Sequence, residues 1–446
     1  MGIISPDEPR YADIGRAMAR TGDWVTPRLW GHPWFEKPAL LYWMTALGFD
    51  LGLGPELAPR LPVALLSLLF LGFYWMRLRL EWGTRVASFS TAMLATSAGW
   101  LTYSHVAVTD VPLAVFFSAA VLFSLGWIAR GERAHLPIAA VCLAFATLAK
   151  GLVPLVLFLP ILVVPAFLYG WRRPLDWFRP APMLAFAICA LPWYVLVTLR
   201  NGSEFLRVFF LQQHFSRFSS AALQHVQPTW FYLPVFLVLL YPWFPLLAFP
   251  SVVWPAAFRS DPRTRTLAAV VIFGFLFFTA SLNKLFGYLI PLIPMAFALL
   301  GLGLSRAKRP GLAMIAPLAL AGALPFAANF AAPVLAHGLR SLGIPVWSIL
   351  IPLALSAAMG AILARFARKY AFFATAACAS LGFLWFQFAA FPALDALGSA
   401  RTLWITDNPR CAPAGPRDLV YGLYYYSGRE LPPCAVLDPS GTRVVR

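Results

Sequence analysis

The chain has 446 residues, of which 60% are hydrophobic and only 12% are charged, whereas an average soluble domain carries about a quarter charged residues. This composition excludes a soluble globular protein and indicates a polytopic, all-α membrane protein. The formal net charge of +17 would suggest nucleic-acid binding in a soluble chain, so the positions of the cations decide what the charge means.

Nearly uncharged apolar runs recur along the chain, and about twelve of them are long enough to cross a bilayer core as helices. They lie near 61–76, 86–104, 111–129, 135–149, 151–169, 181–199, 230–250, 266–282, 285–304, 312–336, 344–364 and 370–392. The sequence therefore predicts about twelve transmembrane helices.

Every second loop between these runs is basic. The basic loops hold, in order, Arg77, Arg79 and Arg85; Arg130 and Arg133; Arg172, Arg173 and Arg179; Arg259, Arg263 and Arg265; Arg306, Lys308 and Arg309; and Arg365, Arg368 and Lys369. Short loops rich in Lys and Arg are retained on the cytoplasmic side of a membrane. The basicity thus indicates membrane orientation, and we expect no nucleic-acid partner.

The alternation divides the chain into three parts. Residues 1–56 form an outer loop with juxtamembrane helices, 57–392 a transmembrane core with an outer loop at 200–229, and 393–446 a small outer tail. Because 1–56 hold no apolar run, we expect either a helix upstream of this sequence or translocation driven by the first span. In the tail, 421–426 reads as a strand, and spacing leaves open whether Cys411 and Cys434 form a disulfide.

Several kinds of chemistry lack their usual sequence signals. The apolar runs contain no Asp, Glu, Lys or Arg, although an ion-coupled transporter normally needs an ionisable group within the bilayer. The sequence also lacks a Walker motif, a dinucleotide-binding glycine pattern and a His-Glu-x-x-His motif. We therefore expect no nucleotide cofactor and place the chemistry at the outer rim of the membrane.

The outer carboxylates are the first candidates for that chemistry. Asp110 stands where a span begins, so its burial is costly unless it is paired or functional; the alternative is a helix N-cap. Asp7 and Glu8 precede an amphipathic stretch at 10–18. With Ser5 they also fit a capping box, so both acids could simply start a helix.

The outer cations are the complementary set. They are Lys37, Lys150, Arg207, Arg217 and Lys284, with His214 as a switchable partner. Arg207, His214 and Arg217 would share one side of a helix, and Phe205 and Phe209 on its other side would lie among lipids. The cations form either a phosphate pocket at the membrane surface or snorkelling side chains that meet lipid headgroups.

An ordered set of short motifs between residues 7 and 300 resembles the GT-C glycosyltransferases, in particular the aminoarabinose lipid A transferases and the protein O-mannosyltransferases. The motifs are Asp7-Glu8-Pro9-Arg10-Tyr11, Gly22-Asp23-Trp24, Phe35-Glu36-Lys37-Pro38 with Leu41-Tyr42-Trp43, Thr109-Asp110, Lys150-Gly151, His214 with Arg217, and Asn283-Lys284 with Tyr288. The resemblance implies a GT-C fold with 13 core helices, of which the first precedes Asp7, so the twelve runs here would lack that helix.

The resemblance also implies the residues of the site. Asp7 would be the catalytic carboxylate and Asp110 a second acid. The donor phosphate would be bound by Lys37, Lys150, Arg217, Lys284 and Tyr288. Glu36 and His214 would bind either the same phosphate or a divalent metal ion.

The function implied is an inverting sugar transfer at the periplasmic face of the bacterial inner membrane, by a multi-pass protein among membrane lipids. The donor would be a sugar linked to polyprenyl (undecaprenyl) phosphate, and the acceptor a lipid A-like glycolipid. Because the tail is shorter than in the aminoarabinose transferases, the resemblance does not fix the acceptor, and protein O-glycosylation is one alternative. The helix count alone also allows a lipid flippase or uncoupled transporter.

Overall fold

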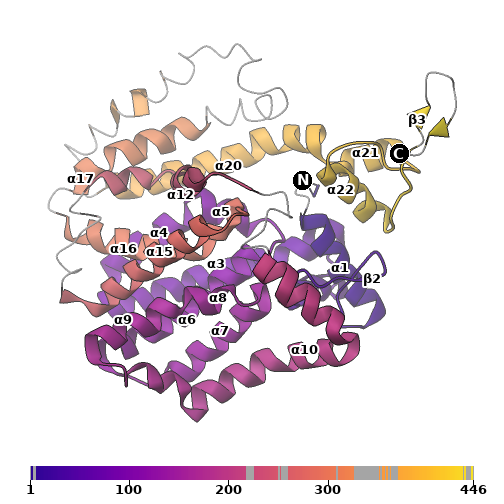
Figure 1. Cartoon of the computed structure of the whole chain (residues 1–446). Helices are drawn as coiled ribbons and strands as arrows, with labels where there is room; N and C mark the ends of the chain where they lie inside the picture. The colour runs from indigo at the N-terminus through magenta and orange to yellow at the C-terminus, as the bar shows by residue number, and fades with distance from the viewer. Residues whose placement is uncertain are drawn as a thin grey trace.

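The computed structural model describes residues 2–3, 7–216, 226–249, 252, 260–307, 310–325, 351, 354–356, 358–359, 362, 370–434, 436–437 and 443–444. In these ranges the chain folds into a bundle of helices with two short antiparallel hairpins. Figure 1 shows α1, β2, α21 and α22 together on the right of this bundle, with the N-terminus close to α22. The predicted all-α class is confirmed.

The elements follow the order of the three predicted parts, but the helix Gly54–Trp82 crosses the predicted boundary at 56/57 and the helix Ala371–Gly398 crosses that at 392/393. The N-terminal part has α1 (Asp7–Thr21), β1 (Arg28–Leu29), β2 (His32–Pro33) and α2 (Leu40–Asp50). The first half of the core has α3 (Gly54–Trp82), α4 (Thr84–Ala95), α5 (Ala98–Ser104), α6 (Asp110–Arg130), α7 (Leu136–Lys150), α8 (Val153–Leu157), α9 (Leu159–Tyr169), η1 (Pro174–Phe178) and α10 (Pro180–Leu206). The second half has η2 (Arg207–Ser216), η3 (Thr229–Phe231), α12 (Tyr232–Leu239), η4 (Phe244–Ala248), α15 (Pro262–Ala280), η5 (Phe286–Leu292), α16 (Ile293–Arg306), α17 (Pro310–Ala313) and α20 (Ala371–Gly398). The tail has α21 (Ala400–Asp407), α22 (Arg417–Ser427), β3 (Val436–Leu437) and β4 (Arg443–Val444).

Six helices in the described ranges are long and apolar enough to cross a membrane. They are Gly54–Trp82, Asp110–Arg130, Pro180–Gln213, Pro262–Ala280, Phe286–Arg306 and Ala371–Ala393. The predicted run at 86–104 is broken into α4 and α5, because the Thr96 and Ser97 hydroxyls donate to the carbonyls of Ala92 and Leu94, at 2.7 and 2.9 Å. The runs predicted at 312–336 and 344–364 extend outside the described residues.

Three of the predicted cytoplasmic loops meet at one end of the bundle. The Glu81 carboxylate, whose side chain is 3% exposed, lies 3.6 Å from Arg77, 3.2 Å from Arg130 and 2.9 Å from Arg263. These residues come from the end of α3, the end of α6 and the start of α15. Three of the six predicted basic loops therefore cluster in space.

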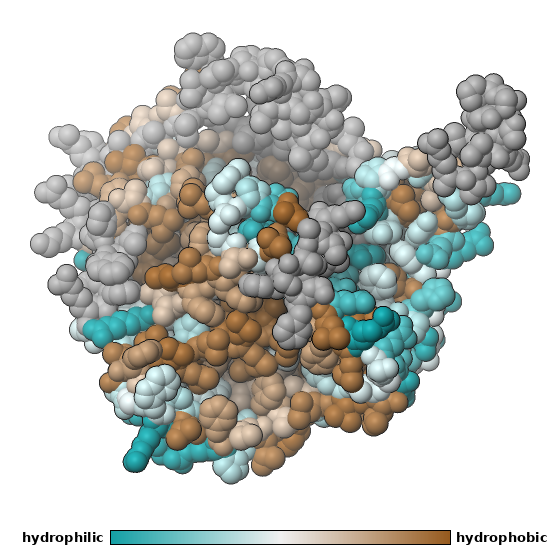
Figure 2. Space-filling model, viewed as in Figure 1, coloured by the Kyte–Doolittle hydropathy of each residue, from teal (hydrophilic) through white to brown (hydrophobic). Residues whose placement is uncertain are grey.

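Large apolar side chains lie exposed along the bundle. Examples on α3, α10 and α20 are Leu68, Leu69, Ile188, Leu199 and Phe388, which are between 65% and 77% exposed. Soluble monomers rarely expose contiguous apolar surface of this kind, whereas lipid tails cover it at no cost. Figure 2 shows brown surface over the bundle and teal side chains gathered on the right, over the N- and C-terminal parts.

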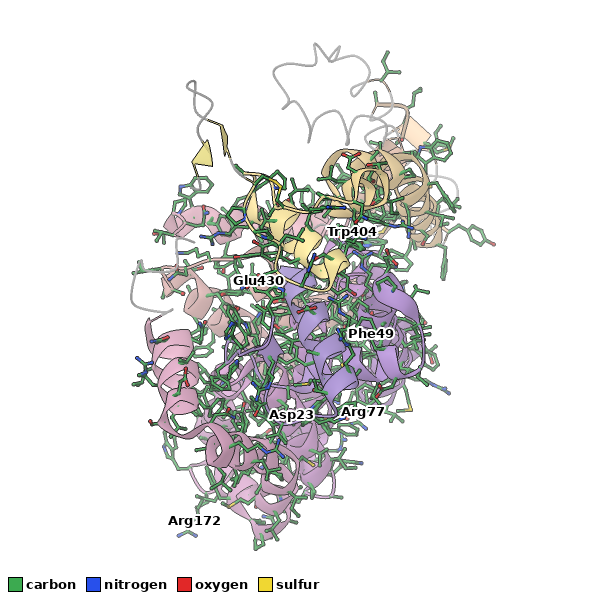
Figure 3. The ribbon with its side chains drawn as sticks, turned by 90° about the vertical axis from the view of Figure 1, so that its right-hand side faces the viewer. Asp23, Phe49, Arg77, Arg172, Trp404 and Glu430 are labelled. Carbon is green, nitrogen blue, oxygen red and sulfur yellow. A yellow bond between two sulfur atoms is a disulfide. The ribbon has the colours of Figure 1, made fainter. Side chains whose placement is uncertain are left out.

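The tail and the N-terminal part pack against each other. The Tyr425 hydroxyl donates to the carbonyl of Pro55 at 2.6 Å, and the Ile3 N–H donates to the Tyr426 hydroxyl at 3.1 Å. A disulfide joins Cys411 to Cys434, with a Cα–Cα distance of 4.9 Å, and closes the loop that carries α22. Figure 3 shows Trp404 and Glu430 of the tail far from Arg172 of a predicted cytoplasmic loop.

The strand predicted at 421–426 is wrong, because these residues belong to helix α22. Pro416 is the N-cap of α22, and Gly428 ends it with a left-handed φ of 72°. Gly422 allows close packing on α21, since a Cβ there would lie 2.5 Å from the Cβ of Ala400. A short run of aromatic and apolar residues fits either element, and here the boundary signals decide.

Candidate active site

A cavity of about 360 Å³ opens at the other end of the bundle from Glu81. The two ends are separated by α6, whose 21 residues span about 30 Å. The cavity is lined by Asp7, Tyr11, Glu36, Lys37, Thr102, Tyr103, Val106, Val108, Thr109, Asp110, Lys150, Leu285, Phe286, Gly287 and Tyr288. Six of the nine predicted site residues are among them: Asp7, Glu36, Lys37, Asp110, Lys150 and Tyr288.

Helix α1 places Asp7 at the cavity. Its apolar face, which includes Tyr11, Ile14 and Met18, is buried as the amphipathic pattern predicted. Glu8 is 1% exposed; it accepts hydrogen bonds from Arg60 at 2.7 and 2.8 Å and from the Ala107 N–H at 3.0 Å. Glu8 therefore fastens the start of α1 to α3 and to the loop before α6, which leaves its neighbour Asp7 on the cavity side.

Cations and phenols surround the carboxylates on this side of the cavity. Arg10 forms ion pairs with Asp7 and, at 3.3 Å, with Glu36. Glu36 also lies 3.1 Å from the Lys37 ammonium and accepts a hydrogen bond of 3.4 Å from the Tyr11 hydroxyl. The Asp7 side chain is 34% exposed but that of Glu36 only 9%, so Asp7 is the carboxylate of this group that is more open to a ligand.

Charge and burial fix the protonation of two of these groups. Burial alone would lower the pKa of Arg10, but Glu36 and Asp7 raise it above its usual value. Burial, together with the charges of Glu36 and Asp7, raises the pKa of the Tyr11 phenol well above 10. Near neutral pH the site therefore holds a permanent cation and a permanent hydroxyl donor next to two carboxylates.

The opposite side of the cavity is built from an ion pair between two helix ends. Asp110 begins α6, Lys150 ends α7, and the Lys150 ammonium lies 2.5 Å from the Asp110 carboxylate. The same ammonium lies 4.7 Å from the centre of the Tyr288 ring. The N-cap of α6 is Thr109, and no side-chain hydrogen bond caps the helix. The capping alternative for Asp110 is therefore wrong, and ion pairing accounts for its burial.

Of the remaining three predicted site residues, Lys284 is the one whose side chain the structure describes, and it is not in the cavity lining. Lys284 is 5% exposed and donates to the carbonyls of Ser281, at 2.5 Å, and Gln227, at 3.2 Å. It therefore ties the loop before η5 to the segment before α12. Arg217 and the side chain of His214 lie outside the described residues.

The segment before Arg217 differs from the expected α-helix. Arg207–Ser216 is a π-helix, whose wider turn changes which residues share a face. Phe205 and Phe209 are fully buried, with Phe205 edge-on to Phe35 at 5.4 Å. The prediction that these two residues lie among lipids is wrong, because aromatic packing beneath the Glu36–Lys37 segment covers them.

Sequence reasoning gave no role to Arg10, Tyr11 or Arg60. Arg10 and Tyr11 stand in the first motif, but a cation three residues after Asp7 on a helix was the only signal for an ion pair. Arg60 lies 52 positions from Glu8, and nothing in the spacing indicates that pairing.

Among the described residues, the neighbours of Glu36 do not suit a divalent metal ion; the side chain of His214, the other expected ligand, lies outside these residues. Arg10, Lys37 and the Tyr11 hydroxyl all donate to its carboxylate or carry positive charge beside it, whereas Mg²⁺ and Ca²⁺ bind clusters of oxygen ligands. Among the residues that the structure describes, no group of three or more His, Cys, Asp or Glu side chains could hold a metal ion.

The fold is that of a known class of membrane glycosyltransferase. The chain matches the crystal structure of ArnT from Cupriavidus metallidurans bound to undecaprenyl phosphate with a TM-score of 0.77 and 29% identity, over 96% of this chain and 81% of that one. The apo structure of the same protein matches with a TM-score of 0.76. The predicted GT-C fold is confirmed.

Sequence comparisons point to the same group of proteins. Residues 3–202 match the family described as dolichyl-phosphate-mannose-protein mannosyltransferase. The undecaprenyl phosphate-alpha-4-amino-4-deoxy-L-arabinose arabinosyl transferase of Edwardsiella ictaluri is 32% identical over 67% of this chain and 55% of its own length. That of Pseudomonas aeruginosa strain LESB58 is 35% identical over 72% of this chain and 61% of its own length.

These similarities confirm the resemblance to GT-C glycosyltransferases of the aminoarabinose transferase type. The chain spans about 55 to 61% of the length of these two curated relatives.

Proposed function

We propose that this chain is a glycosyltransferase that moves a sugar from a polyprenyl phosphate to a lipid A-like glycolipid, with inversion, at the periplasmic face of the bacterial inner membrane. The observation that carries the proposal is the cavity, which joins carboxylates and lysines at the end of the bundle away from the basic loops. The similarity to ArnT and to the aminoarabinosyl transferases supports the polyprenyl phosphate donor and the glycolipid acceptor.

The two lysines of the cavity are suited to the phosphate of the donor. Lys37 and Lys150 enter from opposite sides, and both are nearly buried. In such a site their charges act at low dielectric, so they stabilise the negative charge that develops on the departing phosphate. Asp110 holds Lys150 in place at 2.5 Å, and we assign it a positioning role.

The reaction breaks one bond and forms one. The acceptor oxygen attacks the anomeric carbon, the bond from that carbon to the phosphate oxygen breaks, and polyprenyl phosphate leaves with the bonding electrons. If the acceptor is a hydroxyl, Asp7 takes its proton as a general base. If the acceptor is a phosphate, already ionised near neutral pH, no proton is transferred, and the Asp7 carboxylate stabilises the positive charge that develops on the sugar.

Transfer by the purified protein tests the proposal. The full chain in lipid nanodiscs is incubated with undecaprenyl phosphate-linked aminoarabinose and lipid A, and the products are weighed by mass spectrometry. We expect one sugar to be added to lipid A for each undecaprenyl phosphate released. Asp7→Asn should lower the rate by at least about 100-fold, through loss of the general base for a hydroxyl acceptor or of a stabilising negative charge for a phosphate acceptor. Asp50→Asn, at an exposed carboxylate outside the cavity, should leave the rate unchanged.

Protein O-glycosylation is the second candidate, because the family match at 3–202 is to protein mannosyltransferases. Its acceptor is a Ser or Thr hydroxyl, so it requires the general base. Sugar transfer to Ser/Thr peptides but not to lipid A would select this function. Lipid movement across vesicles without any sugar transfer, and without dependence on Asp7, would select the flippase.

A further inference from the structure

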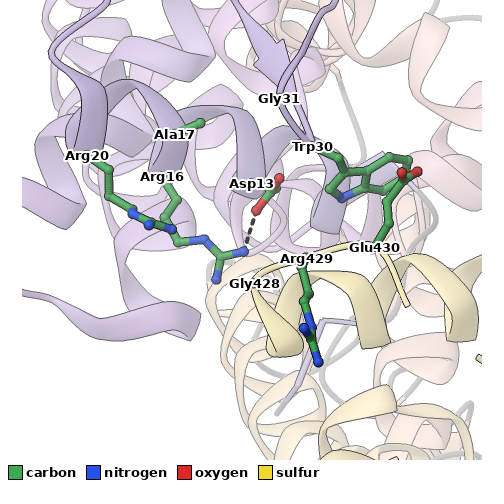
Figure 4. A pocket seen from close by; sticks show the side chains of 9 residues that line it. All are labelled: Asp13, Arg16, Ala17, Arg20, Trp30, Gly31, Gly428, Arg429 and Glu430. Carbon is green, nitrogen blue, oxygen red and sulfur yellow. Dashed lines mark hydrogen bonds and ion pairs between the residues drawn. The ribbon is translucent and has the colours of Figure 1, made fainter. Parts of the chain in front are cut away.

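A second pocket, of about 220 Å³, lies between the N-terminal part and the tail. Its wall is formed by α1, the turn between β1 and β2, and the residues just after α22. The charged residues that line it are Asp13, Arg16, Arg20, Arg429 and Glu430. Figure 4 shows Arg16 and Arg20 on one face of α1, towards Gly428, with Trp30 and Glu430 on the other side.

Two of these arginines, Arg20 and Arg429, are exposed, and their side chains have no ion-pair or hydrogen-bond partner among the described residues. Arg16 forms an ion pair with Asp13 and lies 4.5 Å from the centre of the Tyr425 ring. The guanidinium groups of Arg20 and Arg429 make no hydrogen bond or ion pair with any residue that the structure describes. Arg16 and Arg20 are also four residues apart on α1, where like charges repel. An anion in the pocket would relieve this repulsion.

An aromatic residue completes the wall at some cost to the backbone. Trp30 occupies the first position of the two-residue turn between β1 and β2, with a left-handed φ of 50°. Asn or Gly is preferred there, and a bulky residue is strained. Trp30 contacts Tyr421 and Tyr424 of α22, with ring centres 5.5 and 5.1 Å apart, so it joins the turn to the tail and presents an aromatic surface to the pocket.

The pocket is linked to the active site by direct contacts. Tyr421, which packs on Trp30, also lies 5.5 Å from the Arg10 guanidinium. Arg10 in turn pairs with Asp7 and Glu36 in the cavity. A ligand that contacts Trp30 would therefore be connected to the proposed catalytic carboxylate by three successive side-chain contacts, through Tyr421 and Arg10 to Asp7.

We propose that this pocket binds a phosphate group on a sugar of the acceptor glycolipid and so orients the acceptor towards Asp7. The inference rests on the proposed function for the identity of the lipid. Arg20 and Arg429 supply charge-assisted hydrogen bonds to the phosphate, and Trp30 supplies the flat apolar surface on which a sugar ring packs. The same phosphate chemistry also occurs in the headgroups of membrane phospholipids, so the test separates these two sources.

Native mass spectrometry of the full chain in detergent measures this binding without any sugar transfer. Three lipids are titrated: lipid A with both phosphates, the same lipid after dephosphorylation, and phosphatidylglycerol. The variant is Arg20→Gln with Arg429→Gln. The control is Arg410→Gln with Arg417→Gln, which removes the same charge from exposed tail residues outside the pocket.

We expect the Kd for phosphorylated lipid A to rise at least about tenfold in the variant and to stay unchanged in the control. Dephosphorylated lipid A should bind weakly and equally to all forms. An unchanged Kd in the variant, with an unchanged melting temperature, overturns the proposal. An equal loss of phosphatidylglycerol binding in the variant also overturns the proposal, because the pocket would then bind phospholipid headgroups in general. If lipid A binding depends on the two arginines but no sugar is transferred, the phosphate pocket is supported and the proposed function is contradicted.

Discussion

Gly287 lies against the Asp110 carboxylate, and a single methyl group there would disturb the ion pair that holds Lys150. A Cβ built on Gly287 would be 2.7 Å from Cγ and Oδ1 of Asp110 and 2.9 Å from Oδ2. Non-bonded heavy atoms need about 3.4 Å or more, so the carboxylate has to move by about 0.7 Å. The Lys150 Nζ atom lies 2.5 Å from Oδ1 of Asp110, so a shift of this size would disturb the ion pair.

We predict that Gly287→Ala lowers kcat/KM by about 10- to 100-fold, because displacements of about 1 Å in a catalytic site cost about 100-fold. The overpacking should also lower the free energy of unfolding by about 1–3 kcal/mol. The assay is sugar transfer by the full chain in nanodiscs, with thermal unfolding measured in parallel. Gly72→Ala is the matched control, since a Cβ at Gly72 meets no atom within 4 Å.

A double-mutant cycle separates this cause from general damage. If Gly287→Ala acts through Asp110, it should have little further effect on the rate in an Asp110→Ala background, where the methyl group finds space. Full activity of a folded Gly287→Ala protein would refute the reasoning. So would an equal loss in both backgrounds.

Three further predictions concern stability, pH and metal. Glu8→Gln should lower the free energy of unfolding by about 3 kcal/mol, because it leaves Arg60 without a charged partner. Glu56→Gln, at a more exposed ion pair, should lower it by under about 1 kcal/mol. Equal melting temperatures of the two variants would contradict this prediction. Burial lowers the pKa of Lys284 below 10.5, so the folded state loses this proton at a lower pH than the unfolded state. The free energy of unfolding, measured relative to Lys284→Arg, should therefore rise with pH between the lowered pKa and 10.5. A difference between the two proteins that does not depend on pH would contradict this prediction. Saturating EDTA should leave the transfer rate unchanged, because cations and a phenol surround Glu36, and a rate restored by added Mg²⁺ or Mn²⁺ would show that reasoning to be wrong.

Local signals in the sequence predicted much of the architecture. Apolar runs and basic loops are properties of short segments, and they anticipated the helices and the clustering of three basic loops at Glu81. Charges at the ends of apolar runs were equally informative. Asp110 was singled out because it stands where a span begins, Lys150 was one of the outer cations, and the structure places them in contact.

Long-range pairings could not be predicted in the same way. The contacts of Glu8 with Arg60 and with Ala107 depend on how α1, α3 and α6 pack, and no periodicity records that packing. The same holds for Gly287, whose lack of a side chain has meaning only next to Asp110.

Local ambiguity explains the remaining errors. The aromatic run at 421–426 fits a strand or a helix equally well until its neighbours α1 and α21 are known. The face of the segment after α10 was assigned with α-helical spacing, but the chain there forms a π-helix with Phe209 buried. In both segments, tertiary packing determines which of two local structures of similar energy forms.

The most direct test of the central claim is mass spectrometry of lipid A extracted from cells with the gene, without it, and with an Asp7→Asn version. We predict that lipid A gains the mass of one sugar only in cells that carry the gene with Asp7 intact. A lipid A profile that is the same in all three strains would contradict sugar transfer to lipid A by this chain.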